Sequence, residues 1–324
     1  MTARVVMTNT AIPLAAEAEE AFAGLDVGFE MLDAGSPEDL VRITRDADAV
    51  ITLAEPFTRE VLVQLPRCRS VTRFGIGVDN VDLAAATAQG IWVTNVPDAN
   101  YREVAVHTIA LALSVTRKIG FLNRSMHETG HASLALARGT RRPDEQTFGL
   151  VGLGRIGRRV ATMAQAIGYR VIAADPFTTE ESGVELVSFD EVVARSDILS
   201  LHVPLTGETR DLVDAGVIER MRDGAVLINV SRGGLVDDAA LGRALRAGKL
   251  AGAGIDAYVG EPAPLPESSP LRGLEQVLLT PHSAHYSEES FAEIKTKALA
   301  DVARVLRGER PAYPVNEIPV TESR

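Results

Sequence analysis

Short apolar runs rich in Val and Ile alternate along the chain with longer segments whose apolar positions recur every three or four residues. The short runs predict β-strands and the longer segments predict helices, and their alternation is typical of a parallel α/β architecture. A first set of strands is predicted at 4–9, 27–32, 48–53, 70–75 and 91–96. A second set is predicted at 147–152, 170–175, 197–203, 225–231, 252–257 and 276–282.

Two sets of strands indicate two doubly wound units with parallel sheets. A long apolar segment, 103–122, predicts one buried helix between the sets, and a last helix is predicted at 290–308. The helices at both ends of the second set could be crossings between two domains, and the C-terminal tail would then return to the first domain. We therefore predict a discontinuous domain of residues 1–99 and 289–324, and a second domain of residues 100–288.

Composition narrows the class of protein. The chain has 324 residues, a 46% hydrophobic composition and a net charge of −11, which disfavours nucleic-acid binding. Its single cysteine, Cys68, excludes an internal disulfide and fits a reducing compartment, where we expect it to be a small packing residue. The N-terminus reads as a strand rather than a signal peptide, and no apolar run approaches the roughly 18 residues of a membrane span. We expect a cytoplasmic protein with no membrane partner.

The strongest motif is a glycine-rich turn. Gly152, Gly154 and Gly157 form G-x-G-x-x-G directly after an apolar strand and directly before a helical segment, which is the context of a dinucleotide-binding turn. The next strand ends in Asp175, 18 residues after Gly157, where a carboxylate can accept hydrogen bonds from ribose hydroxyls and would repel a 2′-phosphate. We predict NAD as the cofactor; the alternative is a tight turn with no ligand.

A second motif matches a zinc-protease pattern by its letters. His127-Glu-Thr-Gly-His131 reads H-E-x-x-H, but Gly130 lies inside the required helix, where it costs about 1 kcal/mol relative to alanine. The segment also lies in a polar run, so we predict a helix C-terminus followed by a solvated loop, and no metal site.

Three polar side chains follow strands of the second set, at the edge where open α/β sheets bind ligands. They are Arg232, Glu261 and His282. Arginine can bind a carboxylate and polarise the neighbouring carbonyl, and histidine can exchange a hydroxyl proton near neutral pH. A carboxylate beside the imidazole stabilises its protonated form. This combination suits hydride exchange between an alcohol and a carbonyl, although each residue taken singly could be an ordinary loop residue.

The chain resembles the D-isomer-specific 2-hydroxyacid dehydrogenase family over nearly its whole length. The resemblance rests on GIGVDNVD (75–82), FGLVGLGRIG (148–157), HVPLTGET (202–209), NVSRGGLVDDAAL (229–241), GIDAYVGEP (254–262) and LLTPHSA (278–284). It places the family's catalytic set on Arg232, Glu261 and His282. It implies NAD contacts from Ile76, Gly152, Gly154, Arg155, Ile156, Gly157, Asp175, Val203, Thr209, Val230, Ser231, Arg232, Asp256, His282, Ala284 and His285.

The resemblance also implies a Rossmann NAD-binding domain, a flavodoxin-like substrate domain, an active site in the cleft between them, and a homodimer. The substrate would be a small 2-hydroxy or 2-keto carboxylate held by Arg232 and by backbone amides around Ile76 and Gly77. The residues expected around this substrate are Leu53, Ala54, Glu55, Ile76, Gly77, Arg232, His282 and His285.

Two positions bear on the branch of the family. Leu53 stands where 3-phosphoglycerate dehydrogenases carry a phosphate-binding arginine, which argues against phosphoglycerate. His285 stands where the C-terminal-binding-protein-like branch carries tryptophan; it could line the pocket or face solvent. That branch supplies the alternative function, an NAD(H)-sensing interaction protein with little turnover.

Overall fold

The fold consists of two parallel α/β units, seen in a computed structural model that describes residues 2–179, 183–261 and 263–318. The first unit contains residues 1–100 and 287–324, and the second contains residues 101–286. These divisions lie within two residues of the predicted ones. The predicted segment 289–324 extends past the described residues, because 319–324 lie outside them.

The first unit has a five-stranded sheet of order β2-β1-β3-β4-β5. Its strands are β1 (Ala3–Met7), β2 (Val27–Met31), β3 (Ala49–Thr52), β4 (Ser70–Arg73) and β5 (Trp92–Thr94), all paired in parallel. Every residue of the central strand β3 is buried, which explains its run of three apolar residues before Thr52.

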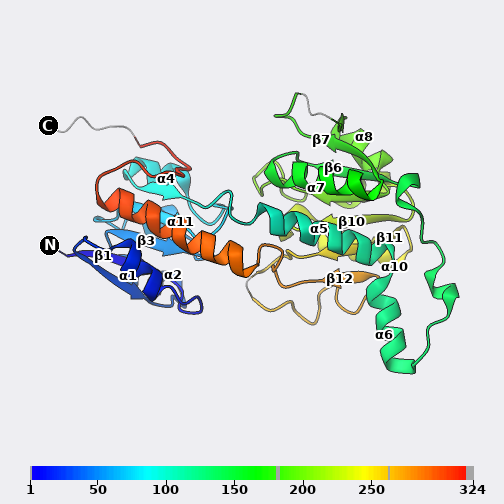
Figure 1. Cartoon of the computed structure of the whole chain (residues 1–324), viewed down its shortest axis with the longest axis horizontal. Helices are drawn as coiled ribbons and strands as arrows, with labels where there is room; N and C mark the ends of the chain where they lie inside the picture. Colours follow the sequence, from blue (N-terminus) through cyan, green and yellow to red (C-terminus); the bar gives the residue numbers. More distant parts are fainter. Residues whose placement is uncertain (1, 180–182, 262, 319–324) are drawn as a thin grey trace. The chain divides into compact units, whose positions relative to one another are not determined.

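Helices cover both faces of this sheet. Helix α1 (Ala15–Ala21) and the last helix, α11 (Glu288–Leu306), bury apolar side chains against one face, and Figure 1 shows α11 beside the strands of this unit. On the other face lie α2 (Pro37–Thr44), α3 (Arg59–Leu62) and α4 (Leu83–Ala88). The buried Asp301 of α11 accepts hydrogen bonds from the backbone N–H groups of Ala312 (2.6 Å) and Tyr313 (2.9 Å), which fixes the segment after the helix.

The second unit has a seven-stranded sheet of order β12-β11-β10-β9-β6-β7-β8. Its strands are β6 (Thr147–Val151), β7 (Arg170–Ala174), β8 (Glu185–Leu186), β9 (Ile198–Leu201), β10 (Ala225–Asn229), β11 (Leu250–Ile255) and β12 (Val277–Leu279). All pairs are parallel, so the predicted pair of doubly wound parallel sheets is confirmed. The two-residue strand β8 was not predicted.

Two layers of helices enclose this sheet. One face is covered by α5 (Tyr101–Thr116) and α7 (Arg155–Ile167), and the other by α8 (Phe189–Arg195), α9 (Ala215–Arg220) and α10 (Asp238–Arg246). Short 3-10 turns occur at Leu134–Ala137, Pro143–Glu145 and Gly233–Leu235.

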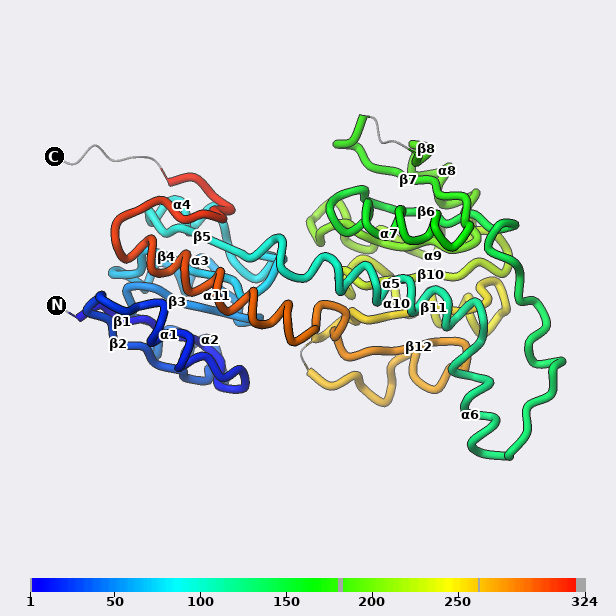
Figure 2. The backbone as a smooth tube through the Cα atoms, in the orientation of Figure 1, coloured from blue at the N-terminus to red at the C-terminus, as the bar shows by residue number. Residues whose placement is uncertain are grey.

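The predicted helix 103–122 was wrong as a single element. It divides into α5 and α6 (Ile119–Thr129), which meet at an angle of 59° around Lys118, a residue with φ +56°. The Lys118 ammonium donates to the carbonyls of Leu136 (3.2 Å) and Arg138 (2.6 Å), which ties the following loop to the bend. Figure 2 shows α6 and this loop extending away from the sheet of the second unit.

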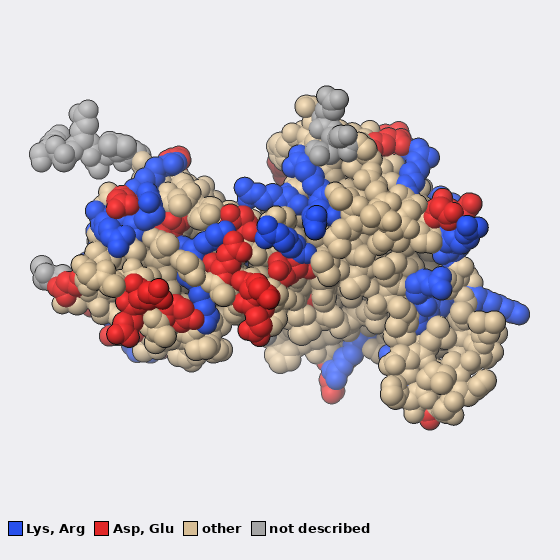
Figure 3. All heavy atoms as spheres, in the orientation of Figure 1, with Lys and Arg blue, Asp and Glu red and all other residues tan. Residues whose placement is uncertain are grey.

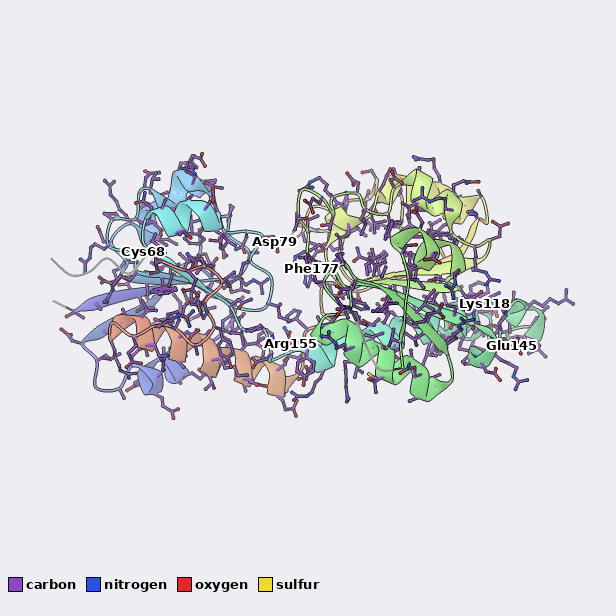
Figure 4. All side chains as sticks on the ribbon, turned by 90° about the horizontal axis from the view of Figure 1, so that it is seen from above. Cys68, Asp79, Lys118, Glu145, Arg155 and Phe177 are labelled. Carbon is purple, nitrogen blue, oxygen red and sulfur yellow. The ribbon has the colours of Figure 1, made fainter. Side chains whose placement is uncertain are left out.

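Among the described residues no single helix combines the length and apolar composition of a membrane span, although α5 and α6 together meet that test. The H-E-x-x-H segment has the predicted local structure: α6 ends at Thr129, and Gly130 terminates it at φ +70°. Cys68 is buried as predicted, and Figure 4 shows it in the first unit, before β4.

Candidate active site

The glycine-rich turn between β6 and α7 is shaped by close backbone packing. Gly152 has φ +97°, and a Cβ atom there would lie 2.6 Å from the carbonyl oxygen of His202. A Cβ on Gly157 would lie 2.3 Å from the carbonyl oxygen of Gly152, whereas nothing lies within 4 Å of such an atom on Gly154. The turn is therefore tight at its two ends and open in the middle. The N-terminus of α7 follows, so the turn fits a pyrophosphate.

Asp175 follows β7, at the same end of the sheet. Its Oδ2 accepts a hydrogen bond from the N–H of Leu153 (2.6 Å), and its Oδ1 accepts from the N–H groups of Phe177 (2.8 Å) and Thr178 (3.1 Å). Burial raises the pKa of Asp175, but these hydrogen bonds outweigh it and hold the pKa below the ordinary value. Asp175 is therefore an anion in the position that suits a ribose with free hydroxyls. Figure 4 shows Arg155 and Phe177 at this end of the unit.

A partly buried histidine lies beneath the glycine-rich turn. His202 Nε2 is 2.9 Å from Ser200 Oγ, and Nδ1 is buried with no hydrogen-bond partner. Burial lowers the pKa of His202 to about 4, so the imidazole is neutral near pH 7 and adds no charge beside a bound phosphate.

His282 and Glu261 form the expected pair. His282 Nδ1 contacts Glu261 Oε2, and Glu261 Oε1 accepts a hydrogen bond from the N–H of Tyr258 (2.5 Å). The side chains are 34% and 19% exposed, so the pair is accessible without being fully solvated. Because Nδ1 contacts the carboxylate, Nε2 is the nitrogen that can exchange a proton with a substrate.

The backbone of His282 has φ +52°, a left-handed conformation that non-glycine residues seldom adopt. The fully buried Asp256 fixes this segment through three backbone N–H groups. Its Oδ1 accepts a hydrogen bond from the N–H of Ser283 (2.9 Å), and its Oδ2 accepts one from the N–H of Ala284 (2.9 Å). Its backbone carbonyl accepts a hydrogen bond from the N–H of His282 (2.8 Å). Thr280 Oγ1 also donates to Asp256 Oδ1 (2.5 Å). The strained conformation is therefore maintained by a buried carboxylate.

Arg232 follows β10, and a glycine joins its turn to the loop of Glu261. The Arg232 guanidinium donates to the Ser231 carbonyl (2.8 Å), and the buried Gly233 comes next. A Cβ on Gly233 would lie 2.1 Å from the carbonyl carbon of Tyr258 and 2.4 Å from the nitrogen of Val259. The two loops that carry Arg232 and Glu261 are thus in direct backbone contact.

The remaining predicted cofactor residues of this unit lie in loops after strands. Val203 and Thr209 follow β9, and the Thr209 hydroxyl donates to the Pro204 carbonyl (2.7 Å). Val230 and Ser231 follow β10, and Ser231 Oγ donates to the Leu201 carbonyl (2.8 Å).

The predicted cofactor residues after His282 lie beside it. Ala284 is buried and its N–H donates to Asp256, and the ring of His285 lies 5.9 Å from that of His282 in an edge-to-face arrangement. Arg155 and Ile156 are the first residues of α7. Their contacts with NAD stay predictions.

The predicted substrate residues of the first unit lie in two neighbouring loops. Leu53, Ala54 and Glu55 follow β3, and Ile76 and Gly77 follow β4. These strands are adjacent in the sheet, so the two loops lie at one edge of it. In Figure 4, Asp79 marks this carboxyl end and Cys68 the opposite end of β4.

No group of three or more His, Cys, Asp or Glu side chains within the described ranges could hold a metal ion. Sequence reasoning missed two supporting residues. His107 Nε2 on α5 lies 3.0 Å from Thr280 Oγ1 and 3.6 Å from Asp256 Oδ1, so it supports the His282 segment. Thr8, which follows β1, donates to Glu55 Oε2 (2.9 Å). Both contacts join residues far apart in the chain, and no local pattern signals them.

Comparison with known proteins agrees with this geometry. The family model described as "D-isomer specific 2-hydroxyacid dehydrogenase, NAD binding domain" matches residues 109–284. The chain is 37% identical over 297 residues to D-3-phosphoglycerate dehydrogenase of Mycobacterium leprae, covering 90% of this chain and 54% of that protein. It thus spans about half the length of that relative.

Two further relatives match along most of their length. Glyoxylate reductase of Korarchaeum cryptofilum is 35% identical over 292 residues, covering 87% of this chain and 86% of the relative. The crystal structure of D-lactate dehydrogenase from Aquifex aeolicus, complexed with NAD and lactic acid, superposes with a TM-score of 0.88 at 27% identity, covering 97% of this chain and all of that one.

Proposed function

The chain belongs to the D-isomer specific 2-hydroxyacid dehydrogenase family, and we propose that it exchanges a hydride between NAD and a small D-2-hydroxy acid or its 2-keto acid. The observation that carries this proposal is the His282–Glu261 pair, which lies at the same sheet edge as the glycine-rich turn and Asp175. A protein that only senses NAD(H) has no need of a proton-exchanging pair. The relatives reported above are dehydrogenases and a reductase, which also favours turnover.

The chain's residues divide the chemistry among them. NAD, held by the glycine-rich turn and Asp175, supplies or accepts the hydride when it is bound. Arg232 binds the substrate carboxylate and polarises the keto group. During reduction, His282 donates the proton at Nε2 to the keto oxygen, while Glu261 stabilises the imidazolium before transfer and fixes the ring through Nδ1. In oxidation the same nitrogen takes the hydroxyl proton.

The test is NADH oxidation against a panel of 2-keto acids, with His282→Asn as the matched variant. Asparagine tolerates the left-handed conformation at position 282, so the loop is retained while the proton donor is lost. We expect a loss of about 10²- to 10⁴-fold in kcat with NADH binding retained. If the wild type turns over no keto acid but binds NADH and changes its oligomeric state, the protein is an NAD(H)-sensing interaction protein instead.

We also propose that the protein forms a homodimer, and the support is the projection made by α6 and the loop after it. No residue of α6 is buried, and Ile119, Met126 and Leu134 are 53%, 52% and 86% exposed. The face of this projection seen in Figure 3 carries few charged side chains. Such a projection suits burial against a second copy. Light scattering should give a dimer mass for the wild type and a monomer mass for Met126→Glu combined with Leu134→Glu; a monomeric wild type would contradict the proposal.

A further inference from the structure

Glu55 in the first unit carries a carboxylate held almost entirely through one oxygen. Its Oε2 accepts hydrogen bonds from the hydroxyls of Thr52 (2.7 Å) and Thr8 (2.9 Å). The same oxygen accepts from the backbone N–H groups of Leu53 (3.1 Å) and Ala54 (3.2 Å). Rotating the carboxylate would break all of these hydrogen bonds together, so its orientation is fixed.

The other oxygen, Oε1, is an acceptor that the protein leaves available. In the described part of the chain no hydrogen bond reaches Oε1, and Glu55 forms no ion pair. The residue is partly exposed, so Oε1 is not a sealed internal atom. Arg73, the cation at the end of β4, donates to the Phe74 carbonyl (2.9 Å). The Glu55 carboxylate is therefore held by hydrogen bonds to Oε2 and by no ion pair within the described residues.

The place of Glu55 in the sheet is where such folds bind ligands. In the order β2-β1-β3-β4-β5, the chain reverses direction across the sheet between β1 and β3. Ligands of open parallel sheets bind beyond the carboxyl ends of the strands at this switch point. Thr8 follows β1 and Glu55 follows β3, so Glu55 lies directly at the switch point. Asn80, in the loop after β4, donates to the Glu55 carbonyl (2.9 Å), which links this site to the loop of Ile76 and Gly77.

We infer that Glu55 determines substrate specificity by selecting a hydrogen-bond donor, such as a hydroxyl, on the carbon next to the keto group. This inference rests on the proposed function and on the expectation, implied by the family resemblance, that backbone amides around Ile76 and Gly77 help Arg232 hold the substrate carboxylate. A donor on the next carbon can reach Oε1 and satisfy it. A carboxylate or phosphate there is repelled, because the Glu55 carboxylate is held in one orientation and Leu53 supplies no cation. A methyl group leaves Oε1 partly desolvated without a partner.

The experiment compares three 2-keto acids that differ at this carbon: hydroxypyruvate carries a hydroxyl, 2-oxobutanoate a methyl and oxaloacetate a carboxylate. We expect wild-type kcat/KM to be highest for hydroxypyruvate, by about 10-fold or more over 2-oxobutanoate and by a larger factor over oxaloacetate. Wild-type preference for oxaloacetate would overturn the inference without any variant.

The matched variant is Glu55→Gln, which changes one atom. Four donors face Oε2, so the glutamine oxygen must take that place and its NH₂ group must take the place of Oε1. The acceptor then becomes a donor, and we expect the ratio of kcat/KM for oxaloacetate over hydroxypyruvate to rise by about 10²-fold. Glu60→Gln, the same change at an exposed residue of α3, should leave the ratio unchanged.

The two levels of the proposal fail in different ways. Turnover of keto acids with the same preference in wild type and Glu55→Gln contradicts the role of Glu55 and leaves the dehydrogenase function intact. An equal shift in Glu60→Gln contradicts it too, because the effect is then one of net charge. No turnover of any keto acid by the wild type removes the proposed function and this inference with it.

Discussion

The contact between the loops of Arg232 and Glu261 can be tested with one methyl group. In Gly233→Ala the new Cβ would start 2.1 Å from the Tyr258 carbonyl carbon and 2.4 Å from the Val259 nitrogen. Carbon atoms in contact are normally about 3.5–4.0 Å apart, so the loops must separate by about 1.5 Å. Both neighbours are backbone atoms, so no rotation of a side chain can relieve the clash.

Separating these two loops should lower both the folding stability and the catalytic efficiency, by different amounts. Overpacking of this kind costs about 1–3 kcal/mol, which corresponds to a fall in Tm of about 2–12 °C for a unit of this size. The N–H of Tyr258 donates to Glu261, so moving that backbone also moves the group that orients His282. A misplacement of about 1 Å in a catalytic group can cost about 10²-fold, and we expect kcat/KM to fall by that order.

Gly234→Ala is the matched control for this prediction. A Cβ on Gly234 would lie 3.0 Å from a terminal carbon of Leu205 and 3.5 Å from the Arg210 guanidinium, both of which are side-chain atoms that can move. Calorimetry and steady-state kinetics on the two variants decide the matter. If Gly233→Ala loses no more activity than Gly234→Ala, the backbone contact does not position Glu261, and the reasoning is refuted.

Two further predictions concern buried ionisable groups. Burial, together with the nearby Asp237, raises the pKa of Asp238 to about 6 against the hydrogen bond from the Val259 N–H, so its ionisation opposes folding above about pH 6 and not below about pH 4. In urea titrations, Asp238→Asn should therefore raise the unfolding free energy by about 1 kcal/mol at neutral pH, after allowance for solvent screening, and leave it unchanged at about pH 4. A lower unfolding free energy at neutral pH would mean that the charge of Asp238 stabilises the start of α10 more than burial disfavours it. Burial raises the pKa of the Cys68 thiol to about 12, so a thiol reagent at mildly alkaline pH should label the protein only as fast as it unfolds, and rapid labelling of the native protein would contradict the burial.

The sequence predicted the strands well because buried parallel strands are continuous apolar runs. It did not predict the break at Lys118, because the apolar pattern continues through it. The bend depends on contacts that only the fold creates, such as Gly120, where a Cβ would lie 2.8 Å from Leu278, and the hydrogen bonds from Lys118 to the loop after α6. Strand β8 has two residues, too few to show a period.

The candidate active site, like the fold, could be predicted only in part from the sequence. Arg232, Glu261 and His282 could be proposed because each follows a predicted strand and all carboxyl ends of a parallel sheet meet at one edge. The side chains that hold these three residues in place could not be predicted from the sequence. Asp256 fixes residues 24 to 28 positions away, and Thr8 reaches Glu55 across 47 positions. Those contacts depend on strand register, which local patterns do not encode.

The first unit is built from both ends of the chain, and this affects its synthesis on the ribosome. Strands β1 to β5 leave the ribosome first, but the core they share with Ile294, Leu299 and Val302 of α11 cannot close until residues 101–286 have also been made. At about 5–20 residues per second this takes roughly 10–40 s. During that interval apolar side chains of the sheet remain open to other nascent chains and to chaperones. The second unit is continuous and can fold before the first is complete.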